Sequence, residues 1–184
     1  MPLSAESHED VIAATRHWLT QAVIGLNLCP FAKAVHVKGQ IRYAVSDAED
    51  MEGVLADLEA ELNTLTAADP AVTDTTLLIL PRALPDFLDY NDCLFFADRM
   101  LKQLRPEGVL QIASFHPLYQ FEGSEPGDIE NYTNRAPYPI LHLLREDSVE
   151  RAVDAFPDAE DIYERNQETL RRIGLAGWNA LMKR

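Results

Sequence analysis

The feature that most constrains the fold is an alternation of short apolar segments with longer segments whose apolar residues recur at helical spacing. The clearest short segment is 75–80, with the sequence TTLLIL, which is closed by Pro81. Continuous apolar runs of this length are typical of strands that are covered on both faces. Similar segments at Ile41–Val45 and 109–115 complete a strand–helix–strand–helix–strand order, which predicts βαβ units around a parallel sheet.

The helices between and around these strands are predicted from apolar stripes. The expected helical ranges are 8–23, the stripe from Met51 to Leu65, 85–104, 148–155 and 158–173. Gly25 is placed to end the first helix, and Ser46 or Asp47 to cap the second. A fourth strand at 140–144 has no long helix before it, so its direction stays open and a mixed sheet is compatible with the pattern.

These segments predict one α/β domain over residues 1–184. Its expected architecture is three-layer-like, with a central, mostly parallel or mixed sheet of about four strands flanked by helices. A length of 184 residues suits a single domain, and the first few residues are expected to be disordered. The segment 117–139 has no clear period but contains four aromatic residues, Tyr119, Phe121, Tyr132 and Tyr138. Since disordered segments are poor in aromatic residues, we expect an ordered loop there.

Charge and cysteine content narrow the classes of partner. The formal net charge of −14 disfavours binding to nucleic acids and to anionic membranes, because both require clustered lysine and arginine. Two cysteines are too few for a disulfide scaffold in a chain of this length. With neither a secretory signal nor an apolar run of membrane-spanning length, a cytoplasmic location is expected. A small anionic molecule remains compatible as a ligand, and the oligomeric state is not determined.

Cys29 is the first candidate for catalysis. It begins the sequence CPFAK, in which Pro30 suits the first position of a short helix. The positive end of a helix dipole lowers a thiol pKa, and Lys33, one turn later, would add to this effect or bind substrate. The alternative interpretation is a small, buried apolar side chain.

His116 is the second candidate for catalysis, because it follows the strand 109–115. In open α/β sheets, ligands bind beyond the carboxyl ends of the strands, where His116 would act as general acid or base. The alternative is a histidine that satisfies backbone groups at the strand end.

The remaining candidates are polar residues near the fourth strand, and each has a structural alternative. Substrate binding is predicted for Asn131, Tyr132, Asn134, Arg135, His142 and Arg145. Arginine and asparagine can hold a planar or anionic group. Asparagines in loops also bind their own backbone, and a histidine between apolar strand residues is often a core residue. If the fourth strand were parallel to the third, Arg145 and His116 would share an edge of the sheet.

Cofactor and metal signatures are weak. The sequence contains no phosphate-binding loop, no dinucleotide fingerprint and no zinc-protease motif, so the cofactor is unknown and no metal site is predicted. A metal held by His116 and His142 is retained only as an alternative. The four-residue sequence CPFA resembles the active-site turn of omega-class glutathione transferases and their glutaredoxin-like domain. That fold, however, places its cysteine after a strand and a proline before a later strand.

A longer set of motifs resembles one family. The words GLNLCPFAK, DYND, ASFHP, DIENYTNR and HLLRE are similar to those of the bacterial family catalogued as domain of unknown function 1415. The resemblance extends from about Thr15 to Trp178. It implies a stand-alone cytoplasmic domain and brings no activity or catalytic residue with it.

Two classes of function therefore remain, and the sequence does not decide whether the protein is an enzyme. The leading hypothesis is a small-molecule enzyme acting on an anionic substrate, with Cys29 as nucleophile or redox thiol and His116 as acid or base. It requires Cys29 and His116 to lie on the same face of the fold. The alternative is a non-catalytic module that binds a ligand or a partner protein, in which Cys29 is buried and unreactive.

Overall fold

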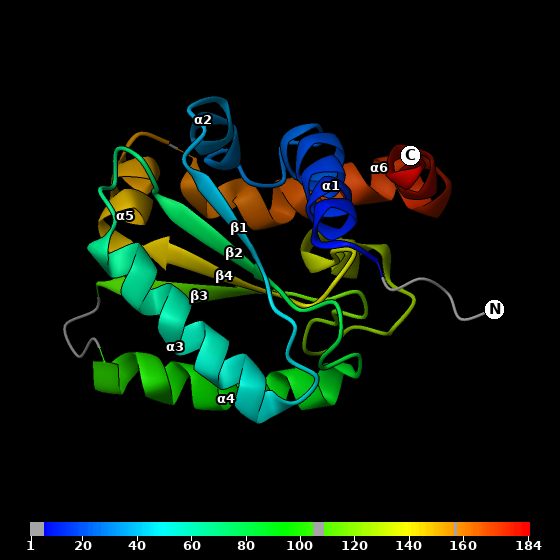
Figure 1. Cartoon of the computed structure of the whole chain (residues 1–184). Coiled ribbons are helices and arrows are strands. Elements are labelled where there is room, and N and C mark those ends of the chain that lie inside the picture. Colours follow the sequence, from blue (N-terminus) through cyan, green and yellow to red (C-terminus); the bar gives the residue numbers. More distant parts are fainter. Residues whose placement is uncertain (1–5, 105–108, 157) are drawn as a thin grey trace.

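The computed structural model describes residues 6–104, 109–156 and 158–184, and places helices on both faces of a four-stranded sheet (Figure 1). The strands are β1 (Ile41–Val45), β2 (Thr75–Ile79), β3 (Leu110–Phe115) and β4 (Ile140–Arg145), in the order β1-β2-β4-β3. This confirms the predicted α/β class and the number of strands. The expected disorder of the first few residues concerns residues 1–5, which lie outside the described ranges.

The sheet is mixed because β4 runs against its neighbours. β1 pairs with β2 in parallel, whereas β4 lies between β2 and β3 and is antiparallel to both. All five residues of β2 are buried, as expected for the apolar run at 75–80. The antiparallel direction of β4 places Arg145 and His116 at opposite ends of the sheet, since Arg145 pairs with Leu110 and Phe115 with Ile140.

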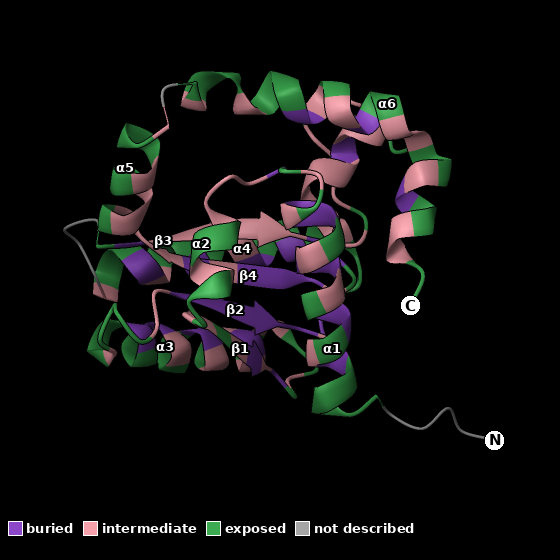
Figure 2. Cartoon of the chain, turned by 90° about the horizontal axis from the view of Figure 1, so that it is seen from above, coloured by how far each residue is buried: buried purple, intermediate pink, exposed green. Residues whose placement is uncertain are grey.

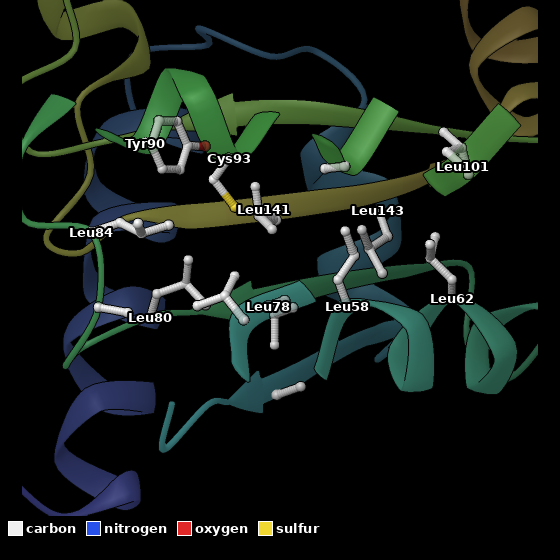
Figure 3. Close-up of a cluster of buried hydrophobic side chains, with 14 of the residues drawn as sticks. Leu58, Leu62, Leu78, Leu80, Leu84, Tyr90, Cys93, Leu101, Leu141 and Leu143 are labelled. Carbon is white, nitrogen blue, oxygen red and sulfur yellow. The ribbon is translucent and has the colours of Figure 1, made fainter. Parts of the chain in front are cut away.

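One face of the sheet is covered by α3 (Met51–Ala67) and α4 (Phe87–Leu104) (Figure 1). Leucines of α3 and of β4 form one buried cluster there with Cys93 of α4, which is fully buried and lies beside Leu141 (Figure 3). The predicted cap of α3 is wrong, because Asp50 occupies that position. Its side chain accepts a hydrogen bond from the Gly53 amide at 2.8 Å.

The opposite face carries the remaining α-helices and a π-helix. These are α1 (His8–Trp18), the π-helix η1 (Leu19–Ile24), α2 (Ala32–Val37), α5 (Glu146–Asp154) and α6 (Ile162–Met182), with a 3₁₀ turn η3 (Ala159–Asp161) before α6. Figure 2 shows β2 and β4 buried below these helices, whose outer surfaces are exposed or half-buried. The helix predicted at 8–23 is thus α1 continued by a π-helix. The last helix extends beyond the predicted 158–173 and includes Trp178, with a break at Gly174 (φ 62°).

The segment 117–139 is ordered, as predicted. It contains the 3₁₀ helix η2 (Ile129–Asn134), and the indole nitrogen of Trp18 donates to the carbonyl of Arg135 at 2.9 Å. Tyr132 packs edge-on against Trp178, with ring centroids 5.2 Å apart. The loop is therefore held between α1 and α6. Within the described ranges, no helix combines the length and the apolar character that a membrane span requires.

Candidate functional site

A cavity of about 240 Å³, here called the inner cavity, lies on the sheet face that carries α1, α2 and α5. Its floor includes Leu77, His142 and Ala113, which are paired neighbours on β2, β4 and β3. Its walls come from α1 and η1, the turn before α2, α2 itself and the start of α5. The wall residues include Trp18, Leu19, Val23, Cys29, Phe31, Ala32, Val35, Val149 and Ala152. The lining is therefore mostly aliphatic and aromatic, which is typical of small-molecule sites.

The π-helix contributes to the shape of this wall. Gly25 donates to the carbonyl of Thr20 at 3.1 Å, five residues back, and a Cβ at Gly25 would lie only 2.2 Å from the Gln21 carbonyl oxygen. The wider turn carries Leu19 and Val23 on the cavity side. Short π-helical segments occur frequently at functional sites.

His142 is a polar group at the centre of the cavity floor, between Leu77 and Ala113. The Thr75 hydroxyl donates its one proton to the Leu143 carbonyl at 2.6 Å, so it must accept from Nε2–H of His142 at 2.7 Å. This fixes the neutral tautomer with an unprotonated Nδ1. Burial lowers the pKa of His142 to about 4, so the ring is neutral at pH 7. In the described part of the chain, no hydrogen bond reaches Nδ1, which leaves it as an acceptor for a ligand.

Cys29 also lines the inner cavity, but the predicted thiolate is not favoured. The residue lies in the turn between η1 and α2, and α2 begins at Ala32 rather than at Pro30. Burial raises the pKa of the Cys29 thiol, and this outweighs the opposing effect of the Phe31 and Ala32 amides. The thiol is therefore protonated at neutral pH. Because Cys29 precedes β1, the glutaredoxin-like arrangement, with a cysteine after a strand, is absent.

A second cavity of about 510 Å³, here called the outer cavity, adjoins the first. Both are lined by Phe31, Val35, Asp74, Ser148 and Ala152. At this boundary Ser148 donates to the Asp74 carboxylate at 2.6 Å, and Arg151 donates to the Ser148 hydroxyl oxygen at 3.1 Å. The outer cavity also contains Lys38 in its lining.

His116 is fully buried on the other face of the sheet from the cavity. Its Nε2–H donates to the Leu84 carbonyl at 2.9 Å, and its Nδ1 accepts from the Leu118 amide at 2.9 Å. Its ring packs against Phe87 and Tyr90 of α4. The structure therefore does not bring His116 and Cys29 together, because the chain turns away from the cavity face where β3 ends. Both ring nitrogens bind backbone groups, which is the structural alternative considered for this residue.

The polar residues of the 130–135 stretch are also engaged with backbone. Asn131 is fully buried, accepts from the Phe121 amide and donates to the Glu125 carbonyl. Asn134 donates to the Ser114 carbonyl. Arg135 donates to two loop carbonyls, at Tyr119 and Pro126, and its guanidinium lies 4.4 Å from the ring centroid of Tyr132. These contacts order the 117–139 loop and place none of the four side chains in the inner cavity.

Arg145 closes the C-terminal end of α3. Its terminal nitrogen donates to the carbonyls of Leu65, Ala68 and Thr73 at 2.7 to 3.0 Å. A cation at this end of a helix is favoured by the helix dipole. Lys33 is exposed on α2 and lines neither the inner nor the outer cavity.

The structure thus unites Cys29 and His142 of the predicted residues, and adds groups that sequence reasoning missed. Thr75, Ala113, Asp74 and Ser148 had no motif to mark them. The sequence offered one signal for the site: His142 alternates with apolar residues along its strand, which indicated that its side chain faces a single side of the sheet. Within the described ranges, no group of three or more histidine, cysteine or carboxylate side chains is placed so that it could hold a metal ion.

Comparisons with known proteins identify a family and no further relative. The sequence model of the family described as "Protein of unknown function (DUF1415)" matches residues 10–180. No curated protein and no solved structure matches the chain. The match includes every residue of the inner cavity.

Proposed function

The chain belongs to the DUF1415 family, and from its geometry we propose that the protein binds a small, largely apolar molecule in the inner cavity. One observation carries the proposal. An apolar cavity contains a neutral histidine whose donor proton is already engaged by Thr75 and whose Nδ1 remains available. Apolar pockets with few, fixed polar groups are the usual form of a ligand site.

The fixed tautomer predicts what the ligand offers. A neutral imidazole with Nε2–H directed at Thr75 can only accept at Nδ1, so the matching group on the ligand is a donor such as a hydroxyl. A volume of about 240 Å³ lies below the roughly 300–1,000 Å³ of pockets for drug-sized ligands. The occupant is therefore small, or it extends into the outer cavity.

A cysteine-dependent enzyme has less support from the same geometry. Cys29 lacks the lowered pKa that a nucleophilic thiol needs. The hypothesised partners His116, Arg135 and Arg145 have backbone partners outside the cavity. Ligand binding without a covalent step, the alternative drawn from the sequence, is the better match.

Calorimetric titration with straight-chain alcohols from butanol to decanol tests the proposal. Alcohols of suitable length should bind and saturate, because the chain fills the cavity and the hydroxyl donates to Nδ1 of His142. The variant Ala113→Leu adds a side chain beside His142 on the cavity floor and should weaken binding at least about tenfold, a loss near 1.4 kcal/mol.

The matched control is Ala60→Leu, which makes the same change on the exposed surface of α3. It should bind as the wild type does. Equal affinities of the Ala113→Leu and wild-type proteins, with both folded by circular dichroism, would place the alcohol elsewhere and reject the inner cavity as its site.

A further inference from the structure

The geometry points to an amphipathic ligand, with its apolar chain and hydroxyl in the inner cavity and an anionic head group, carboxylate or phosphate, in the outer cavity. This assignment rests on the proposed function and deepens it by naming the class of ligand. It requires that the two cavities communicate and that the outer one favours an anion.

Continuity follows from the shared lining. Phe31 and Val35 on the α2 side and Ser148 and Ala152 on the α5 side contribute to both cavities. A chain that leaves the inner cavity between α2 and α5 therefore enters the outer cavity directly. Since the inner cavity of about 240 Å³ is smaller than the usual pocket for a drug-sized ligand, a ligand that exceeds this volume must use the exit.

The charge of the outer cavity is opposite to that of the protein as a whole. Among its described lining residues, Lys38 and Arg151 are cationic and Asp74 is the single acid, in a chain whose formal net charge is −14. The Asp74 carboxylate already accepts a hydrogen bond from the Ser148 hydroxyl at 2.6 Å. Two exposed, long cationic side chains next to an apolar cavity match a head group such as a carboxylate.

The test compares ligands that differ only at the outer end. At each chain length from four to ten carbons, the matched set contains three compounds: the ω-hydroxy carboxylate, the ω-hydroxyalkyl phosphate and the α,ω-diol. Each is titrated by calorimetry. The anionic members should bind roughly threefold to tenfold tighter than the diol, as expected for two solvent-exposed ion pairs. The preference should shrink as salt is raised, and the better of the two anions identifies the head group.

Paired variants separate a local site from the overall charge. Lys38→Met with Arg151→Met should remove the preference for the anion, measured within the variant as the ratio of anion affinity to diol affinity. Lys33→Met with Arg172→Met alters the net charge equally at exposed positions outside both cavities and should keep the preference.

The outcomes distinguish the two proposals. Equal binding of diol and anion by the wild type, or equal loss of preference in both double variants, overturns the head-group assignment and leaves the inner cavity as a binding site. An alkylammonium alcohol that binds tightest would also overturn it and would make Asp74 the anchoring group. Failure of every member of the series to bind rejects the proposed function itself.

Discussion

Acidification should lower the free energy of unfolding of this protein through His142. The size of the loss follows from the difference between the pKa of His142 in the folded and in the unfolded chain. Burial lowers the pKa of His142 to about 4, whereas the unfolded chain titrates near the ordinary value of 6.5. Between these two values the unfolded state holds more protons than the folded state. The free energy of unfolding therefore falls as the pH drops below 6.5, and the loss is complete near pH 4.

The magnitude follows from about 1.4 kcal/mol for each unit of pKa difference. At about pH 5, some 1.5 units below the unfolded value, His142 alone should cost about 2 kcal/mol relative to pH 7. Urea denaturation at the two pH values measures the loss. Other titratable groups also change the stability between these pH values. The relevant quantity is therefore the difference in this loss between the wild type and a variant without His142.

The variant His142→Gln keeps an amide donor for the Thr75 hydroxyl but does not titrate. Its loss of stability between pH 7 and 5 should be smaller than that of the wild type by about 2 kcal/mol. The variant His36→Gln, on α2 and outside the linings of both cavities, is the matched control. If His142→Gln and wild type lose the same stability to within about 0.5 kcal/mol, the reasoning about the buried neutral ring is refuted.

Two further predictions concern residues that sequence reasoning had placed in the site. Arg145→Met should destabilise the fold by about 3 kcal/mol in urea denaturation, because partly buried carbonyls at the end of α3 and in the loop before β2 lose a charged donor. Arg171→Met, which breaks only an exposed ion pair with Glu130, should cost less than about 1 kcal/mol; similar losses would contradict the capping role. Cys29 should react with iodoacetamide at pH 7 more slowly than a free cysteine, since its thiol is protonated, and an alcohol bound in the inner cavity should slow it further. In the variant Cys93→Ala, Cys29 is the one cysteine left to label. Rapid labelling that the alcohol does not slow would contradict both the raised pKa of the Cys29 thiol and its place in the inner cavity.

The candidate site could be predicted only in part. Cys29 and His142 were among the predicted residues, and they line the same cavity. His116, Asn131 and Arg135 carry the same donor and acceptor groups as site residues do, but here those groups bind backbone. A side chain's composition does not reveal whether its partner is a carbonyl of the same protein or a ligand. That depends on which loops lie beside it after folding.

The position of the cavity was also not predictable. The general rule for open parallel sheets pointed to the carboxyl end of β3, where His116 lies. The cavity is instead on the face of the sheet, near the start of β2 at Asp74 and Thr75 and the end of β4. Because β4 inserts antiparallel between β2 and β3, the outcome depended on a strand direction that the local pattern left open.

The periodicity of apolar residues by itself determined the helices and strands, the α/β class and the fully buried β2, because these depend on neighbours within a few residues along the chain. Only the tertiary structure decided the strand order, the antiparallel direction of β4, the π-helical turn and the separation of His116 from Cys29. These depend on contacts between residues far apart in the sequence, such as Thr75 with His142 and Trp18 with Arg135. The inner cavity arises from several such contacts together, since its floor is made by strands and its walls by helices that meet only in the folded chain.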